Sequence, residues 1–364
     1  MLLKRNKILI IIGVGIQLII LSNLGINSEN EQVFVDASTN SNLYVNFIAE
    51  VDISVGYKIR LENNRAYISS NEGIEIIDVQ NPTTPIWMKT IEDGTMGFDV
   101  KDNIVYTTNS NGLITINTTL ASSPEIIGSS NTGQWAYNLR VNDTLVFAIV
   151  SGDMDIYNVS NLTNPVLIGQ YIDSGRGNDI IIHNEIAYYA DPDEGLEVIN
   201  ITDCTNPEKI RTVTNTLGAW DLYINNELLY LGCHGLGFKI LDISNPINPI
   251  VIKQFNDGGE VYGVCGNNSY IFLGDLQEGV EVLNNSNPIQ LIEVASYTAT
   301  PHDIEYQGNY IYVADQDNGF LLLELSNIRI EHTSDVQLFY GLVIIPLIGI
   351  KMIILSKKNL REKI

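Results

Sequence analysis

Seven similar segments, spaced about 40 residues apart, run through the middle of this 364-residue chain. Each begins at a turn, usually with a glycine, and continues as a run of alternating apolar residues, as in Gly237-Phe-Lys-Ile-Leu-Asp-Ile. The successive spacings are 39, 41, 42, 42, 42 and 40 residues. A repeat of this length built from short strands has the size of one four-stranded propeller blade. We therefore predict an all-β fold, a seven-bladed β-propeller over residues 43–326, with repeats that start at Gly73, Gly112, Asp153, Gly195, Gly237, Gly279 and Gly319.

The fifth repeat shows how a blade divides into four strands, named A to D in chain order. Its predicted strands are residues 220–224, 227–231, 238–243 and 250–255. They are rich in Val, Ile, Leu and Tyr, which favour a pleated, half-buried surface. The connections carry Asn, Gly and Pro, where hairpins need positive φ or a rigid stop.

Strand C, the glycine before it and the loop after it follow a motif that recurs along the chain, Gly-Φ-x-Φ-Φ-Asp-Φ-Ser-Asn-Pro-x-x-Pro, where Φ is apolar. It is clearest from Gly237 to Pro249, and Gly73-Ile-Glu-Ile-Ile-Asp-Val-Gln-Asn-Pro-Thr-Thr-Pro is a second good match. This pattern resembles the LVIVD-repeat family of β-propellers over nearly all of residues 43–326. The second and sixth repeats depart from it. The resemblance implies the propeller fold but no particular activity, because propellers host many functions.

The seventh repeat has strands A, B and C and then runs out at Ser326. Residues 43–51, Leu-Tyr-Val-Asn-Phe-Ile-Ala-Glu-Val, precede the first repeat and have no partner of their own. We predict that they supply the missing strand D. Such a Velcro closure would remove two open sheet edges at once.

The net charge of −23 is concentrated in the propeller region. Residues 31–335 hold 12 basic and 41 acidic side chains, a formal charge of −29. A surface of this sign repels polyanions, so a nucleic-acid partner is excluded. Cations and partners with basic patches would be attracted.

Two apolar segments flank the propeller. Residues 1–24 have a basic start and an apolar core, and predict a signal peptide or an uncleaved signal anchor. Residues 338–355 are apolar except for Lys351 and predict a transmembrane helix. The basic tail, 356–364, is then cytoplasmic by the positive-inside rule. Residues 25–42 and 327–337 are a linker and a tether, and the propeller is expected outside the cell membrane.

Alignment of the starts of strand A gives two columns of residues around one mouth of the central channel. One interpretation is a binding funnel, with aromatic platforms above carboxylates. The other is structural: the aromatic residues pack between blades, and the aspartates accept backbone N–H bonds. The candidate ligand-binding residues are Tyr57, Phe98, Tyr137, Trp220, Tyr262 and His302 in the first column, and Asp99, Asp179, Asp221 and Asp303 in the second.

Acidic B–C turns are the candidate metal sites. Asp191 and Asp193 lie in one turn, and Asp315 and Asp317 in another, each followed by a glycine. Closely spaced oxygen ligands suit Ca²⁺, the one cofactor that these turns would accept. Turn chemistry alone also explains the Asp-x-Asp pattern. No EF-hand pattern accompanies it.

Catalytic motifs are scarce. The sequence has no Gly-x-Ser-x-Gly, no His-Glu-x-x-His and no phosphate-binding glycine loop. His302-Asp303 is the one pair that suggests acid–base chemistry. The three cysteines, Cys204, Cys233 and Cys265, form no Cys-x-x-Cys pair; they are core residues or include a Cys233–Cys265 disulfide.

Three functions follow as hypotheses. The first is a cell-surface interaction module that binds a protein or glycan on its membrane-distal face. The second is a metal-dependent or His-assisted hydrolase or lyase at the channel mouth, which requires His302 and two carboxylates to converge. The third is a structural component of the cell envelope.

Overall fold

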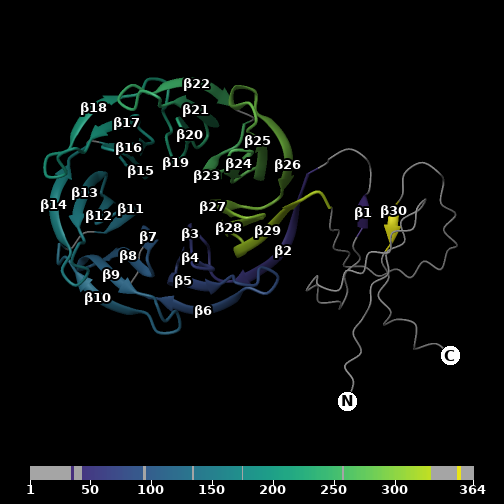
Figure 1. Cartoon of the computed structure of the whole chain (residues 1–364), viewed down its shortest axis with the longest axis horizontal. Helices are drawn as coiled ribbons and strands as arrows, with labels where there is room; N and C mark the ends of the chain where they lie inside the picture. The colour runs from purple at the N-terminus through teal and green to yellow at the C-terminus, as the bar shows by residue number, and fades with distance from the viewer. Residues whose placement is uncertain are drawn as a thin grey trace, which may run out of the picture. The chain divides into compact units, whose positions relative to one another are not determined.

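The computed structural model describes residues 43–328 except 93–95, 133–134, 174 and 256–257, together with two short strands at 34–36 and 351–353. Residues 48–324 form one unit, a ring of seven four-stranded antiparallel sheets (Figure 1). The predicted all-β, seven-bladed propeller is confirmed. No α-helix occurs among the described residues, and η1 (Pro288–Gln290) is a single 3₁₀ turn.

Each of the first six blades has its four strands in chain order. The first two blades are β3 (Lys58–Glu62), β4 (Arg65–Ser70), β5 (Gly73–Asp78), β6 (Ile86–Ile91), and β7 (Phe98–Lys101), β8 (Ile104–Asn109), β9 (Gly112–Asn117), β10 (Glu125–Ser129). The third and fourth are β11 (Ala136–Asn142), β12 (Leu145–Val150), β13 (Asp153–Asn158), β14 (Val166–Tyr171), and β15 (Asp179–His183), β16 (Ile186–Asp191), β17 (Gly195–Asn200), β18 (Glu208–Thr212). The fifth and sixth are β19 (Asp221–Asn225), β20 (Leu228–Gly232), β21 (Phe238–Asp242), β22 (Ile250–Phe255), and β23 (Val261–Gly266), β24 (Tyr270–Asp275), β25 (Gly279–Asn284), β26 (Ile292–Tyr297).

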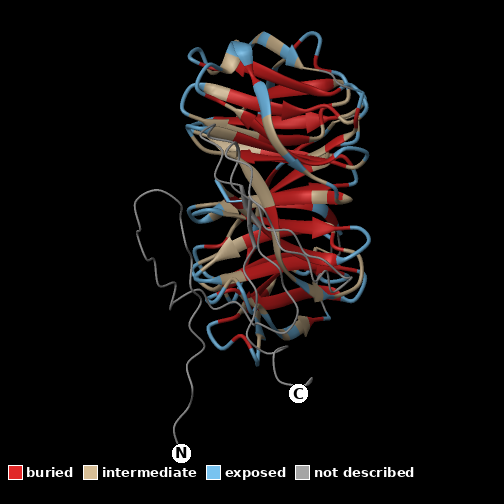
Figure 2. Cartoon of the chain, turned by 90° about the vertical axis from the view of Figure 1, so that its right-hand side faces the viewer, coloured by how far each residue is buried: buried red, intermediate tan, exposed pale blue. Residues whose placement is uncertain are grey.

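Burial explains the sequence pattern of each strand. The middle strands B and C are buried on both faces, because a neighbouring blade covers each side; β16 is buried at every position. Strand D forms the rim and alternates between exposed and half-buried residues, as β22 does. Figure 2 shows this gradient, with buried residues in the inner strands and exposed ones at the edges. The cores lie between blades: Tyr188 and Leu196 of the fourth blade pack in one cluster with Leu222 and Leu231 of the fifth.

The A–B hairpins follow from their turn residues. Asn63 and Asn64 have φ of 50° and 61°, and Asp102 and Asn103 have φ of 57° and 60°. Two consecutive residues with positive φ are the requirement of a type I′ turn, whose twist matches that of the strands. These turns fix the register of strand A, and therefore decide which of its side chains face the channel.

The last blade has the strand order β2-β29-β28-β27, with β27 (Pro301–Gln307), β28 (Tyr310–Asp315), β29 (Gly319–Ser326) and β2 (Tyr44–Asp52). The strand before the first repeat thus lies at the outer edge of the seventh sheet. Ile48 and Val51 pack against the cluster that contains Ile59 and Phe320. That the ring depends on this strand for its integrity stays a prediction.

Most of the flanking predictions lie outside the described residues. These are the signal segment (1–24), the linker (25–42) apart from 34–36, the tether (327–337) beyond 328, and the basic tail (356–364). Of the expected helix at 338–355, only 351–353 are described, and they form strand β30 (Lys351–Ile353), antiparallel to β1 (Phe34–Asp36). The described part of the chain contains no helix able to cross a membrane.

Candidate functional site

An arc of aromatic rings lines half of the channel mouth on the side of the D–A loops. Tyr57 stacks on His302 with ring centroids 5.4 Å apart, and His302 lies 5.6 Å from Tyr262. Trp220 meets Tyr262 edge to face at 5.0 Å. His234 completes the group and accepts or donates a 2.9 Å hydrogen bond with the Tyr262 hydroxyl. The arc spans blades five, six, seven and one.

The other half of the mouth is less aromatic. Met96, Tyr137 and Asn178 lie there, and Tyr137 is 65% exposed. Together with the arc they surround a cavity of about 260 Å³, called here the mouth cavity. Its floor consists of Lys58, Asn138, Asp221 and Asp303.

Phe98 does not belong to the mouth. It is fully buried between blades, in a cluster with Tyr67 and Val105. The A–B turn of the second blade begins at residue 102, so Phe98 precedes it by four residues, as Ile59 precedes the turn at 63. Phe98 therefore occupies a core position. Met96 lies at the mouth, in the position that the alignment had assigned to Phe98.

Asp99 is displaced in the same way, two residues further down its strand than the other aspartates. Its Oδ2 accepts the backbone N–H of Val141 in the next blade at 2.9 Å. The other aspartates make the same bond nearer the mouth: Asp179 to Leu222, Asp221 to Val264 and Asp303 to Ile59, at 3.1, 2.7 and 3.1 Å. The structural role foreseen for the aspartates is thus present at all four positions. Their role as ligand contacts stays a prediction.

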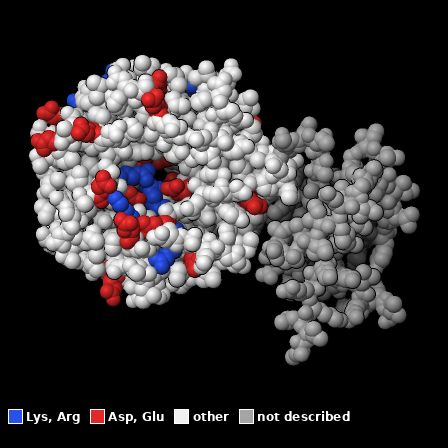
Figure 3. Space-filling view, viewed as in Figure 1, with Lys and Arg blue, Asp and Glu red and all other residues white. Residues whose placement is uncertain are grey.

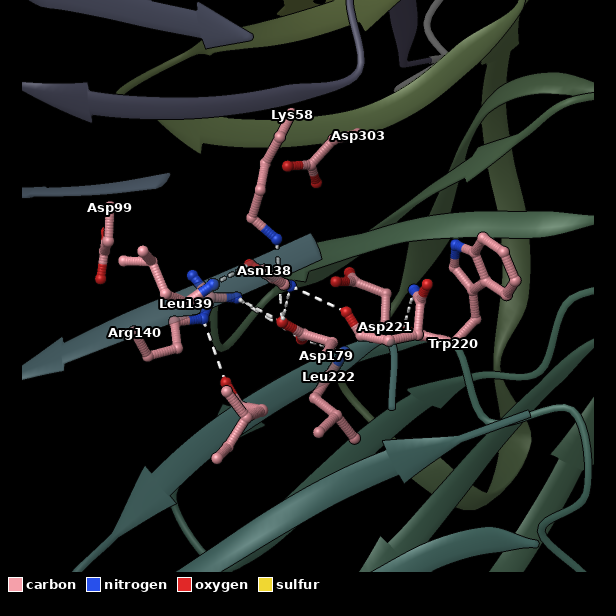
Figure 4. Close-up of polar contacts among 12 residues, drawn as sticks. Lys58, Asp99, Asn138, Leu139, Arg140, Asp179, Trp220, Asp221, Leu222 and Asp303 are labelled. Carbon is pink, nitrogen blue, oxygen red and sulfur yellow. Dashed lines mark hydrogen bonds and ion pairs between the residues drawn. The ribbon is translucent and has the colours of Figure 1, made fainter. Parts of the chain in front are cut away.

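Below the mouth, a belt of charged side chains lines the channel. Figure 3 shows basic and acidic side chains gathered around the hollow at the centre of the ring. Arg60 pairs with Asp303 and Glu305, both at 3.3 Å, and lies 3.6 Å from Asp99. Asp179 is the second residue of the belt on which several ion pairs converge. Lys58 and Arg140 reach it from other blades at 3.7 and 3.4 Å, and Asn138 donates to it at 2.6 Å (Figure 4).

These contacts shift the pKa values of the belt in opposite directions. Burial alone would raise the pKa of Asp179, but Arg140, Lys58 and Arg60 outweigh it and hold that pKa below its usual range. Burial, with Arg60 next in importance, lowers the pKa of Lys58 to about 8. Burial and then the carboxylates of Asp179 and Asp303 raise the pKa of Asp221 well above its usual range.

A second cavity, of about 350 Å³, opens on the side of the A–B turns. Arg60, Arg140, Asp221 and Glu305 line it along with apolar residues such as Val264. The charged belt therefore separates two cavities on the ring axis.

Two of the aspartates that were predicted as metal ligands accept backbone N–H groups of their own turns. Asp191 Oδ1 accepts the backbone N–H groups of Asp193 and Glu194, at 2.6 and 2.7 Å. Asp193 turns away to form a bidentate pair with Arg176. In the seventh blade, Asp315 likewise accepts the N–H of Asp317 at 3.0 Å. These aspartates form no three-ligand cluster among the described residues.

One acidic cluster of metal-binding size does occur in the described ranges, formed by Asp173, Glu194 and Glu197. Lys209 binds both glutamates and lies 3.0 Å from Glu194. A lysine ammonium therefore already supplies positive charge to this cluster. The three cysteines are free, so the Cys233–Cys265 disulfide is not formed.

Among the described residues, His302 forms no set with two carboxylates whose side-chain ligand atoms all lie within 4.8 Å of one another. His302 Nδ1 lies 3.2 Å from the Gly56 carbonyl oxygen, and the side chain also bonds to Gln316. Burial lowers the pKa of His302. The Asp303 carboxylate is engaged by backbone N–H groups and Arg60 rather than by His302.

Sequence reasoning missed His234 and the lower half of the belt. Arg60, Arg140 and Glu305 lie two residues beyond the second column, and period-two alternation places such residues on the same side of strand A. The alternation along strand A could therefore have identified Arg60, Arg140 and Glu305 from the sequence. No comparable signal pointed to His234, because it reaches the mouth from a B–C turn rather than from strand A.

Comparison with known proteins supports the fold. The LVIVD repeat matches residues 57–93, 147–173, 174–215, 218–257 and 301–328, which belong to blades one, three, four, five and seven. The two unmatched blades are those whose repeats depart from the motif. No curated protein matches the sequence.

Many solved structures resemble the ring, among them the two that follow. The β-propeller domain of Cps50 (Swd1) from Myceliophteria thermophila has a TM-score of 0.63 at 9% identity, and the match covers 78% of this chain and all of that one. The computationally designed Ika8 protein has a TM-score of 0.57 at 10% identity, with the same coverage. At such low identity the likeness concerns the fold alone.

Proposed function

We propose that this chain, an LVIVD-repeat β-propeller by its five matched segments and its seven-bladed ring, is an interaction module that binds a protein or glycan at the mouth cavity. The observation that carries the proposal is the aromatic arc. Its rings are half-buried, contact one another and come from four blades, so they form one preorganised surface. Large rigid side chains of this kind dominate binding surfaces because they lose little entropy on binding.

The charged belt supports a binding role over a catalytic one. Asp179 and Asp303 are engaged by cations and by backbone N–H groups. Groups used in this way hold neighbouring blades together. The mouth cavity is therefore a rigid concave surface above a packed charged layer.

The strand directions support a membrane-distal mouth. Strand C runs away from the mouth, so β29 ends on the opposite face, and β2 begins on that same face because it runs toward the mouth. If residues 338–355 cross a membrane, both chain ends attach the face opposite the mouth to it. We therefore propose a propeller outside the cell membrane, with its mouth projecting outward and a cytoplasmic tail.

Alanine substitution tests the binding surface. Trp220→Ala and Tyr262→Ala should abolish capture of a partner by the full-length protein, with the melting temperature little changed. Ile126→Ala, on the exposed outer rim, is the matched control and should leave capture intact. If the two mouth variants bind like the control, the mouth is not the binding surface. If they mainly lose stability, their rings are structural.

Surface labelling tests the orientation. In a Cys204→Ser background, Glu278→Cys should react with a bulky reagent on intact cells, and Asn245→Cys should react less. Both positions are exposed, Glu278 in a B–C turn and Asn245 in a C–D loop, and Cys233 and Cys265 are buried. Equal labelling, or the reverse order, would contradict the proposed orientation.

A further inference from the structure

We infer that the mouth cavity takes a basic side chain, lysine or arginine, of a protein partner, with the aromatic arc around the charged group and Asp221 as its counter-ion. This inference rests on the proposed function, because it names what the same surface binds. It is carried by the state of Asp221, the charge balance of the channel and the chemistry of the walls.

Asp221 is a buried carboxylate without a cation of its own. It is 8% exposed and lines the mouth cavity directly beside Trp220. Its Oδ2 accepts the backbone N–H of Val264, and Lys58 and Arg140 act on it only from beyond ion-pair distance. In the part of the chain that the structure describes, no lysine or arginine nitrogen lies within ion-pair distance of it. The ionised form of a carboxyl group in this position is unfavourable, and an incoming cation would stabilise that form.

The belt as a whole also contains fewer basic groups than acidic ones. Its carboxylates outnumber its cations by two: the acidic residues are Asp99, Asp179, Asp221, Asp303 and Glu305, and the basic ones are Lys58, Arg60 and Arg140. The cations gather around Asp179, Asp303 and Glu305. The uncompensated charge therefore lies toward Asp221, at the floor of the mouth cavity.

The walls suit a cation. Tyr57, Tyr262 and Trp220 present aromatic rings around the cavity, and an ammonium or guanidinium group over such rings gains cation–π attraction. Burial lowers the pKa of His302, which favours the neutral ring and so weakens its repulsion of a positive charge. The strongly acidic chain favours the approach of a basic partner over longer distances.

An organic cation fits better than a metal ion. Among the described residues, the one set of three close carboxylates is Asp173, Glu194 and Glu197, outside the mouth cavity. In its described lining, the mouth cavity offers a metal one carboxylate without an ion pair, Asp221, and a ring of aromatic carbon. A long side chain can instead bury its methylene groups against the rings and carry its charge to Asp221.

Among the described residues that line the mouth cavity, Lys58 is the one that opposes a cation. It lies 3.7 Å from Asp179 and carries positive charge below its pKa of about 8. It should weaken the binding of a cation without preventing it. Lys58→Gln should therefore bind a basic ligand more tightly than the natural protein does, and Asp221→Asn less tightly.

The test is a titration of the purified full-length protein that contains 5-fluorotryptophan, followed by ¹⁹F NMR. The three tryptophans give three signals, which Trp→Phe variants assign. The probes are the peptides Gly-Gly-Lys-Gly-Gly and Gly-Gly-Arg-Gly-Gly, the neutral peptide with norleucine in place of lysine, free n-butylammonium, and chitotriose as a neutral glycan. Asp221→Asn keeps an acceptor for the Val264 N–H, and Asp317→Asn is the matched control on an exposed turn of the same face.

The lysine and arginine peptides should move the Trp220 signal and leave those of Trp87 and Trp135 in place. Asp221→Asn should weaken their binding about tenfold or more, and Asp317→Asn should not. Weaker binding of n-butylammonium than of the lysine peptide would identify a protein side chain rather than a free amine as the ligand.

Three results would overturn the inference: equal binding of the norleucine and lysine peptides, equal binding by the Asp221→Asn protein, or no movement of the Trp220 signal. A response to chitotriose alone would also overturn it, yet would leave the mouth as a binding surface. The proposed function is judged separately, by the loss of partner capture in Trp220→Ala, and does not depend on the charge of the ligand.

Discussion

The carboxylate of Asp303 accepts the backbone N–H of Ile59 at 3.1 Å, although 244 positions separate the two residues in the chain. Asp303 lies in the seventh blade and Ile59 in the first. The same bond joins Asp179 to Leu222 between the fourth and fifth blades. The junction at which the ring closes is thus built like a junction in its interior.

Removal of this carboxylate should weaken the closed ring. Asp303→Ala leaves the Ile59 N–H without its acceptor and Arg60 without one of its ion pairs. We expect a loss of about 3 kcal/mol in the free energy of unfolding. Asp303→Asn should lose less, because the amide oxygen still accepts the N–H. Urea unfolding of the two variants checks this, and equal stability of Asp303→Ala and the natural protein would contradict it.

Deletion of residues 44–52 removes β2 from the edge of the seventh sheet. Strand β29 would then present unpaired N–H and C=O groups, which recruit other chains. We expect aggregation, measured by light scattering, and a lower melting temperature. A soluble truncated protein of unchanged stability would show that the ring does not need this strand.

Phe98 and Tyr137 were both predicted at the mouth, and the structure places them in opposite environments. Phe98 is fully buried and Tyr137 is 65% exposed. Phe98→Ala should lower the free energy of unfolding by about 3–5 kcal/mol because it leaves a cavity in the core. Tyr137→Ala should change it by less than about 0.5 kcal/mol. Chemical denaturation compares them, and similar losses would mean that the two positions are equivalent.

The stability of the ring should depend on pH through Asp221. Its carboxyl group faces Asp179 and Asp303, which raise its pKa after burial does, and Lys58 and Arg140, which lower it. Because the pKa is raised on folding, protonated Asp221 favours the folded state, and this contribution is lost as the pH rises from the unfolded value of about 3.9 through the folded pKa.

Asp221→Asn mimics the protonated carboxyl group at every pH. It should therefore be more stable than the natural protein at pH 8, by on the order of 1 kcal/mol, and the difference should shrink toward pH 4. Thermal unfolding over this pH range measures the difference. A constant difference would show that the Asp221 carboxylate is not disfavoured by folding.

Asp315 should act as a turn residue and not as a calcium ligand. It accepts the N–H of Thr300, at 2.7 Å, and those of Asp317 and Asn318. Asp315→Ala should lower the free energy of unfolding by about 1–3 kcal/mol. Added Ca²⁺ or a chelator should leave the melting temperature of the natural protein unchanged. A rise with Ca²⁺ that is lost in Asp315→Ala would restore the metal interpretation.

Much of the ring was predictable because each blade is a local structure. The 40-residue period, the Asn-rich hairpins and the alternating strands specify a blade without reference to the others. Seven such units bury their faces only against one another, which makes the closed ring a consequence of the repeat. The fifth blade shows this: strand β22 was predicted at its observed bounds, and β19, β20 and β21 within one residue.

The site was decided by the tertiary structure. A shift of two residues in the second blade sends Phe98 into the core and Asp99 deeper into the channel, and only the hairpin turn reveals that register. The charge balance around Asp221 depends on side chains from blades far apart in sequence, such as Lys58 and Asp303. Sequence alone determines which residues each strand A contributes. Which charges meet on the axis, and which one is left without a partner, depends on distances of a few ångströms that exist only once the ring has closed.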